Sequence, residues 1–274
     1  GFTLSNAARS LVMALSLARF TRVPAAGPST RFFQHINRFS ASFAFATDVA
    51  MLSLGGYLKK KETLSARLGD VLSFMYLASM VLKHDANQGR PDADQPIVEW
   101  ACRTLLYRAQ EQLHGFLRNF PVRWLAALMR LFIFPRGLTY SAPGDRLGRQ
   151  IVDVVMTPSE ARDRLTHGIY RTVEAGNALG MLQEAMLLSQ SAEPIEKRIR
   201  VEGTKTGRVT ALDLAGQIQQ SLAAGIITET EAAQMREYDR KVMELVHVDD
   251  FEAHELGTLS QADALTARRS QAVA

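Results

Sequence analysis

Apolar residues recur at steps of three and four along most of this chain, the spacing that places them on one face of an α-helix. The clearest case is NRFSASFAFATDVAMLSLGGYL at 37–58, whose apolar stripe consists of Phe39, Phe43, Ala46, Ala50 and Leu54. Few polar residues interrupt this segment, so we expect a helix that is covered on several sides. The same spacing predicts helices over about 65–84 and 95–120. No segment shows the sustained alternation of apolar and polar residues that is typical of a β-strand, and the sequence therefore predicts an all-α fold.

The chain is expected to fold into two helical parts. Its 274 residues, of which 47% are apolar and 22% charged, can bury a substantial core and are too many for one small bundle. Prolines and glycines cluster between 118 and 144, where a single helix would not tolerate them. The predicted parts are a helical bundle over 1–120, a Pro/Gly-rich amphipathic connection over 121–143, a smaller C-terminal helical domain over 144–256 and a disordered tail over 257–274.

Capping residues predict three helix starts in the second part. The segment TPSE at 157–160 has a threonine cap, a proline in the first turn and a glutamate placed to cap back. The segment TETE at 228–231 repeats that pattern, and Asn177 can cap the run that begins at Ala178.

The charge is unevenly distributed along the chain. Residues 1–150 contain 19 Lys and Arg against 9 Asp and Glu, whereas residues 151–274 contain 13 against 19. A basic first half suits nucleic acid, an anionic membrane or phosphorylated ligands. No compact basic motif is interleaved with aromatic residues, so we expect no nucleic-acid partner. Cys102 is the only cysteine, which excludes an internal disulfide and favours a cytoplasmic location.

The most apolar stretch, RNFPVRWLAALMRLFIFPRGL at 118–138, is interrupted by arginines and prolines. A transmembrane helix needs about 20 apolar residues, but only six residues separate Arg123 from Arg130. These two arginines share one helical face. The pattern suits a helix at a bilayer surface and equally a buried interdomain or dimer helix. The membrane-surface or interface candidates are Arg118, Arg123, Trp124, Arg130, Phe132, Phe134 and Arg136.

Two Glu-x-x-His pairs have the ligand spacing of di-iron helical bundles. They are Glu111 with His114 and Glu244 with His247. In helical projection both glutamates lie about 200° from the apolar residues of their helices, so they point to solvent. We therefore predict no metal ligand, and a di-iron oxidoreductase is a minor alternative. Nucleotide-binding glycine motifs and a nucleophile elbow are also absent from the sequence.

Several longer segments resemble a known family. They are 37–83, which contains SARLGDVLS, FIFPRGLTYSAPGDRLGRQI at 132–151, LGMLQEAMLLSQSAEPIEKRI at 179–199 and ITETEAAQM at 227–235. Over about residues 1–256 the chain resembles the C-terminal part of bacterial FadE-type (long-chain) acyl-coenzyme A dehydrogenases. The resemblance implies a parent flavoprotein that uses FAD to catalyse the first α,β-dehydrogenation of fatty-acid β-oxidation. It also implies an acyl-coenzyme A substrate and an electron-transfer flavoprotein as the electron acceptor.

In that family the flavin segment and the catalytic base lie upstream of the matching region. Long-chain members carry an extra helical region that is associated with dimer contacts and membrane binding. We therefore expect an inactive C-terminal fragment with no catalytic or cofactor-binding residue, whose parent forms a homodimer. We expect a cytoplasmic location, where the apolar helix could contact the inner face of the cytoplasmic membrane peripherally. The alternative is a non-enzymatic helical scaffold or membrane-binding protein.

One motif imitates the family's catalytic base. Glu202-Gly203-Thr204 matches the Glu-Gly-Thr around that base in many members. The preceding EPIEKRIR resembles the distal C-terminal region of the family, and no His-Gly-Gly element precedes it. We therefore do not assign Glu202 as a base.

Overall fold

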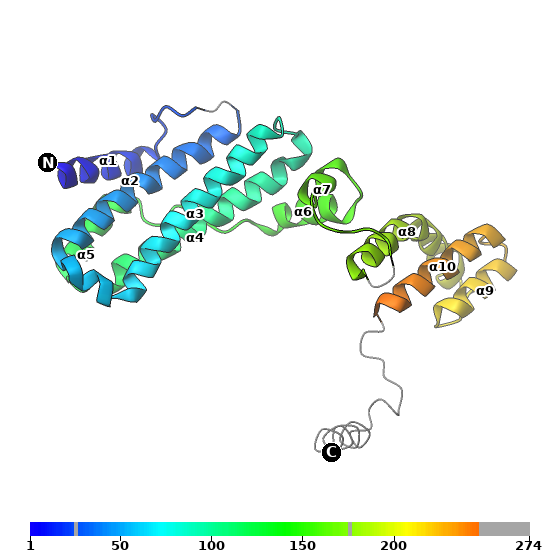
Figure 1. Ribbon diagram of the computed structural model, residues 1–274. Coiled ribbons are helices and arrows are strands. Elements are labelled where there is room, and N and C mark those ends of the chain that lie inside the picture. Colours follow the sequence, from blue (N-terminus) through cyan, green and yellow to red (C-terminus); the bar gives the residue numbers. More distant parts are fainter. Residues whose placement is uncertain (25–26, 175–176, 247–274) are drawn as a thin grey trace, which may run out of the picture. The chain divides into compact units, whose positions relative to one another are not determined.

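The computed structural model describes residues 1–24, 27–174 and 177–246, and these residues form helices and no strand (Figure 1). This confirms the predicted all-α fold. The chain divides into two compact units, Gly1–Leu165 and Thr166–Ala274. The sequence prediction placed this division earlier, between 118 and 144. The tail predicted at 257–274 lies outside the described residues.

The first unit consists of three long helices with shorter ones packed around them. In chain order its elements are α1 (Phe2–Ser16), α2 (Ser29–Leu54), the 3₁₀ helix η1 (Gly55–Lys60), α3 (Glu62–Asn87), the 3₁₀ helix η2 (Asp92–Asp94), α4 (Gln95–Asn119), α5 (Arg123–Ile133), α6 (Asp145–Met156) and α7 (Glu160–Leu165). Helices α2, α3 and α4 run side by side, and α1 lies along α2 (Figure 1). The short helix α5 packs against α1, α2 and α4.

The core of the first unit contains most of the stripe predicted on α2. Phe39, Ala46 and Ala50 are buried, and Phe43 and Leu54 pack against the core at its edge. Helices α3, α4 and α5 complete this core with Leu64, Leu68, Val71, Met75, Leu106, Leu113, Phe116, Leu117, Met129 and Ile133. Burial of each large apolar side chain contributes about 1.5–3 kcal/mol, so this cluster provides much of the stabilising free energy of the unit.

The Pro/Gly-rich connection belongs to the first unit because buried polar side chains hold it there. The side-chain carbonyl oxygen of Gln110 on α4 accepts hydrogen bonds from the backbone N–H groups of Thr139 and Tyr140, at 2.8 and 3.0 Å. Its amide nitrogen donates to the carbonyl oxygen of Tyr140 at 2.8 Å. The buried guanidinium of Arg38 donates to the Thr139 hydroxyl at 2.8 Å. Prolines and glycines therefore end helices here without ending the compact unit.

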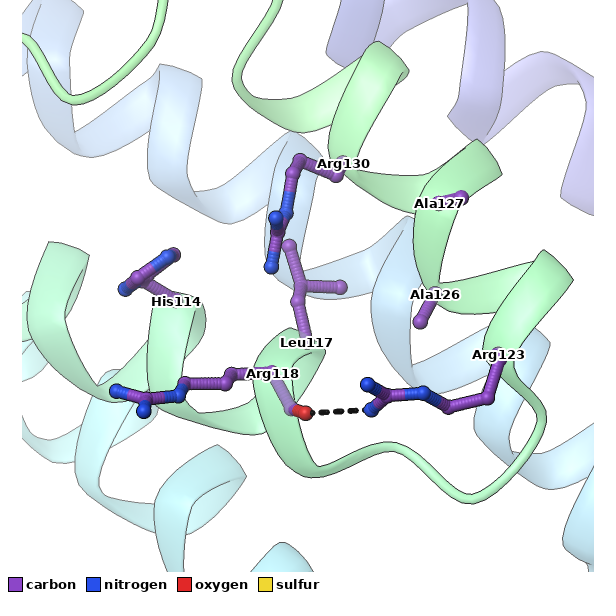
Figure 2. Close-up of a pocket in the computed structure, with 7 residues that line it drawn as sticks. All are labelled: His114, Leu117, Arg118, Arg123, Ala126, Ala127 and Arg130. Carbon is purple, nitrogen blue, oxygen red and sulfur yellow. Dashed lines mark hydrogen bonds between the residues drawn. The ribbon is translucent and has the colours of Figure 1, made fainter.

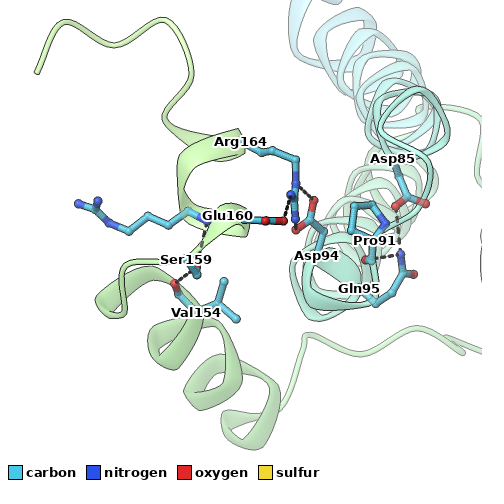
Figure 3. A network of polar contacts seen from close by, with 9 residues as sticks. Asp85, Pro91, Asp94, Gln95, Val154, Ser159, Glu160 and Arg164 are labelled. Carbon is cyan, nitrogen blue, oxygen red and sulfur yellow. Dashed lines mark hydrogen bonds and ion pairs between the residues drawn. The ribbon is translucent and has the colours of Figure 1, made fainter.

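Helix α7 is attached to the main bundle by a bidentate ion pair between Arg164 and Asp94 (Figure 3). The Arg164 guanidinium donates from Nε and Nη2 to the two carboxylate oxygens of Asp94, at 2.9 and 2.7 Å. Paired N–H groups match a carboxylate in both spacing and charge. Ser159 caps α7 by accepting a hydrogen bond from the backbone N–H of Arg162 at 3.2 Å, so the cap lies two residues after the predicted Thr157.

The second unit is a smaller helical domain with its own core. Its described elements are α8 (Ala178–Arg198), the π-helix η3 (Ile199–Thr204), α9 (Leu214–Ala223) and α10 (Glu229–Val246). The core consists of Ala192, Ile195, Ile199, Val209, Ile218, Ile226, Ile227, Ala232 and Met235. None of these side chains belongs to the core of the first unit, so each unit buries its apolar residues separately.

The predicted helix starts in the second unit differ in outcome. At α10 the Thr228 hydroxyl accepts from the backbone N–H of Glu231 at 3.3 Å, and the Glu231 carboxylate accepts from the N–H of Thr228 at 2.9 Å. This reciprocal pair confirms the capping box. Asn177 occupies the position before α8, but its side chain makes no capping bond and donates to the carbonyl oxygen of Thr172 instead.

Candidate functional site

Helix α5 leaves a continuous part of its surface open to solvent. Val122, which precedes it, has an extended backbone, and the helix then runs for 11 residues. One face packs into the core through Ala126, Met129 and Ile133. The opposite face exposes the three large apolar side chains Trp124, Leu128 and Leu131, with 69%, 42% and 62% of their surface accessible. Steps of four and three residues place all three on one side of the helix.

The structure separates the seven residues predicted for this site. Trp124 and the four arginines Arg118, Arg123, Arg130 and Arg136 are exposed. Phe134, by contrast, is buried in the core, and Phe132 is partly buried with its ring 5.6 Å from that of Phe45. These two phenylalanines therefore pack mainly against the bundle, and neither presents an exposed ring to solvent as Trp124 does. The reason is that they lie on the side of the chain that faces α1, α2 and α4.

Three of these arginines surround one hollow between the end of α4 and α5, which we call the arginine hollow (Figure 2). It has a volume of about 460 Å³ and is lined by His114, Leu117, Arg118, Arg123, Ala126, Ala127 and Arg130. The Arg123 guanidinium donates to the carbonyl oxygen of Arg118 at 3.0 Å. The fourth arginine, Arg136, lies elsewhere and donates to the carbonyl oxygen of Leu15 at 3.1 Å.

The electrostatics of the arginine hollow are uniformly positive. No carboxylate lines it, and no ion pair joins Arg118, Arg123 or Arg130 to an acidic residue in the part of the chain that the structure describes. Partial burial lowers the pKa of His114, and the charges of Arg130 and Arg118 lower it further. His114 is therefore biased to its neutral form. Such a hollow can bind an anion, and it contains neither a nucleophile nor a carboxylate base.

Sequence reasoning missed His114 as a member of this site and considered it only as a metal ligand. The spacing of four residues between His114 and Arg118 was the available signal, because it places both side chains on the same face of α4. Glu111, the glutamate of the same Glu-x-x-His pair, is exposed and accepts a hydrogen bond from the Tyr107 hydroxyl at 2.9 Å. Among the described residues, no group of three or more His, Cys, Asp or Glu side chains could hold a metal ion. His247 of the second pair lies outside the described residues.

The Glu-Gly-Thr motif lies in the π-helix of the second unit. Glu202 is exposed there, and its carbonyl oxygen accepts a hydrogen bond from the Thr206 hydroxyl at 2.7 Å. A Cβ atom on Gly203 would come within 2.6 Å of the Val209 side chain, so this glycine is needed for close packing. The motif therefore has a structural explanation that does not involve a catalytic base.

Two helical segments meet the length and composition of membrane spans. They are Ser29–Lys60, which comprises α2 and η1, and Glu62–Asn87, which is α3. Core helices of soluble proteins meet the same criteria, and both segments contribute to the core of the first unit.

The fold and the hollow together describe an all-α module with a basic, apolar-flanked surface helix and no catalytic constellation among its described residues. A family model described as acyl-CoA dehydrogenase, C-terminal, bacterial type matches residues 1–251. The chain therefore belongs to this family, whose parent enzymes are oxidoreductases. No solved structure was found to match the chain.

Proposed function

We propose that this chain is the C-terminal part of an FAD-dependent acyl-coenzyme A dehydrogenase that catalyses the first α,β-dehydrogenation of fatty-acid β-oxidation. In this proposal the chain performs no chemistry itself and holds the enzyme at the inner face of the cytoplasmic membrane through α5. The family match over residues 1–251 supports the first part. The acyl-coenzyme A substrate and the electron-transfer flavoprotein are then partners of the whole enzyme.

The arginine hollow does not fit FAD. Apart from the imidazole of His114, its lining contains no aromatic ring and no hydroxyl that could pack against or hydrogen-bond a flavin ring. Its three guanidiniums are suited above all to the phosphates of such a cofactor. We therefore derive no redox step from this chain and expect FAD to be bound by other parts of the enzyme.

The exposed face of α5 carries the membrane proposal. Trp124, Leu128 and Leu131 are apolar and face solvent, and a helix surface of this kind is stabilised when it inserts among lipid acyl chains. Arg123 and Arg130 flank the same face, where their charges would meet anionic headgroups. The apolar residues thus match the acyl-chain region of a bilayer surface, and the arginines match its headgroup region.

Vesicle co-sedimentation tests this proposal directly. Replacing both Trp124 and Leu131 with alanine should weaken binding to anionic vesicles by about tenfold, because much of the apolar surface that would enter the bilayer is removed. The matched control replaces Val201 and Leu212 of the second unit, which are also exposed, with alanine and should bind as the wild type does. Unchanged binding of the α5 variant would contradict the proposal and assign this face to a protein interface.

We also propose that the enzyme is a homodimer, as the sequence resemblance implies. The observation that favours it is a second apolar stripe, on α3. Leu72, Tyr76 and Met80 follow one another at steps of four residues and are each more than 40% exposed. No basic side chain alternates with them along this stripe, which suits contact with another protein better than contact with anionic lipid.

A further inference from the structure

We propose that the arginine hollow binds a phosphate group, and that this group belongs to the headgroup of an anionic lipid. The first half of this inference stands on the hollow alone. The second half rests on the proposed membrane contact of α5.

The donors of the hollow come from two elements that converge on one space. Arg118 and His114 extend from α4, whereas Arg123 and Arg130 extend from α5. In Figure 2 the guanidiniums of Arg123 and Arg130 reach from α5 into the space that His114 borders on the other side. A guanidinium presents several N–H groups in a fixed plane, and two or three of them together match the oxygens of a phosphate.

The hollow has an excess of positive charge that an anion would offset. Among the described residues, the guanidinium of Arg123 donates one hydrogen bond, to the backbone carbonyl oxygen of Arg118, and Arg118 and Arg130 donate none from their side chains. Glu111 on α4 lines a neighbouring hollow that His114 and Arg118 also border, but its carboxylate accepts a hydrogen bond from Tyr107 and forms no ion pair with Arg118 among the described residues. Partial burial lowers the pKa of His114, and the positive charges of Arg130 and Arg118 lower it further, so these cations also disfavour a proton on the imidazole between them. A bound phosphate would replace repulsion with attraction.

The shape of the hollow also favours a ligand of this size. The two alanines of its α5 wall, Ala126 and Ala127, leave a volume of about 460 Å³ open. This volume exceeds what a chloride ion needs, and it lies within the range of about 300–1,000 Å³ that is typical of small-molecule sites.

The position of the hollow favours a lipid as the source of the phosphate. Ala127 lies on α5 between the side of Arg123 and Arg130 and the side of Trp124 and Leu131, because each residue turns the helix by about 100°. A headgroup held in the hollow would therefore have its acyl chains beside the exposed apolar face. A soluble phosphate ester would use the same donors and gain nothing from that face.

The experiment compares a hollow variant with a variant of equal charge. Arg118→Gln with Arg130→Gln removes two donors of the hollow. Arg9→Gln with Arg22→Gln removes two exposed arginines of the same unit and is the matched control. A third variant, Ala127→Phe, fills the hollow and keeps every charge. Helicity and melting temperature, measured by circular dichroism, show that each variant is folded.

Each variant is titrated with two kinds of vesicle and with one soluble probe. The vesicles contain phosphatidic acid or, at matched surface potential, oleate, which carries a carboxylate in place of the phosphate. The soluble probe is inorganic phosphate, measured by calorimetry with chloride at equal ionic strength as its control.

We expect the hollow variant and Ala127→Phe to lose about tenfold in affinity for phosphatidic acid vesicles beyond any loss in the control variant. Oleate vesicles should distinguish the variants far less. Binding of inorganic phosphate that only the hollow variants lose, without a vesicle effect, would keep the phosphate site and overturn its assignment to a lipid. Equal behaviour of hollow and control variants toward all probes would overturn the inference altogether.

This design also separates the inference from the proposed function. If alanine at Trp124 and Leu131 leaves vesicle binding unchanged while the hollow variants still lose inorganic phosphate, the membrane function fails and the phosphate site stands. If alanine at Trp124 and Leu131 weakens vesicle binding while the hollow variants bind vesicles and inorganic phosphate as the control variant does, α5 binds the membrane through its apolar face without a specific headgroup site.

Discussion

At the scale of single residues, the first unit contains a partly buried histidine among arginines that should make its stability depend on pH. His35 lies beside Tyr140, with its ring nitrogen Nδ1 2.9 Å from the phenol oxygen. Burial lowers the pKa of His35 from 6.5 to about 4, and the nearby charges of Arg31, Arg38 and Arg19 add to this effect. The folded protein therefore keeps His35 neutral in a pH range where the unfolded chain would protonate it.

The sign of the effect follows from this difference in pKa. Between pH 6.5 and about 4 the unfolded state binds more protons than the folded state, so stability falls as the pH falls. This group alone should cost about 2 kcal/mol of unfolding free energy between about pH 7 and pH 5. His35→Gln should reduce that loss in urea unfolding experiments. His84→Gln, at an exposed position, is the control and should retain the wild-type pH dependence; equal slopes for both variants would contradict the assignment.

At the scale of elements, apolar periodicity and capping residues predicted where helices form, but they did not predict how the helices and connections pack together. The helix predicted over 65–84 spans Glu62–Asn87, because apolar spacing depends only on local geometry. Prolines in the 121–143 connection correctly mark helix ends, but the sequence could not reveal that Gln110 and Arg38 hold this connection on the bundle. Likewise, Trp124 and Phe132 are both aromatic residues of the same apolar stretch, and the sequence does not distinguish which of them is exposed. Only the tertiary contact with Phe45 decides that Phe132 faces inward.

The arginine hollow illustrates the same limit. Composition indicated an anionic partner for the first half, and the arginines of 118–138 were recognised as candidates. Their convergence with His114 depends on how α5 folds back on the end of α4, and no local pattern in the sequence specifies that arrangement. Arg136, only six residues from Arg130, lies outside the hollow for the same reason.

The proposed dimer can be tested on the stripe of α3. Leu72→Glu with Tyr76→Glu introduces two charges on an exposed face, where they should not disturb the fold but should repel a second copy. We expect sedimentation velocity to show a shift from twice the chain mass of 30.3 kDa to a single chain. Val201→Glu with Leu212→Glu in the second unit should leave the mass unchanged. A wild-type protein that sediments as a monomer at all concentrations would contradict the homodimer.

At the scale of the whole molecule, the chain has two hydrophobic cores that share no residue. Cooperative unfolding follows the packing of a core, so each unit should respond to damage in its own core. Leu113 is fully buried in the first unit, and Met235 is fully buried in the second. Replacing either with alanine should cost about 2–5 kcal/mol in the unit that contains it.

Hydrogen exchange measured by mass spectrometry can locate that loss. Leu113→Ala should accelerate exchange in peptides from residues 1–165 and leave those from 177–246 unchanged, whereas Met235→Ala should do the opposite. Leu212→Ala, at a side chain that is 98% exposed, is the control and should change neither unit. Acceleration of both units by either core variant would mean that the chain unfolds as one cooperative body. Independent responses would instead allow the membrane and phosphate experiments on α5 to be interpreted within the first unit alone.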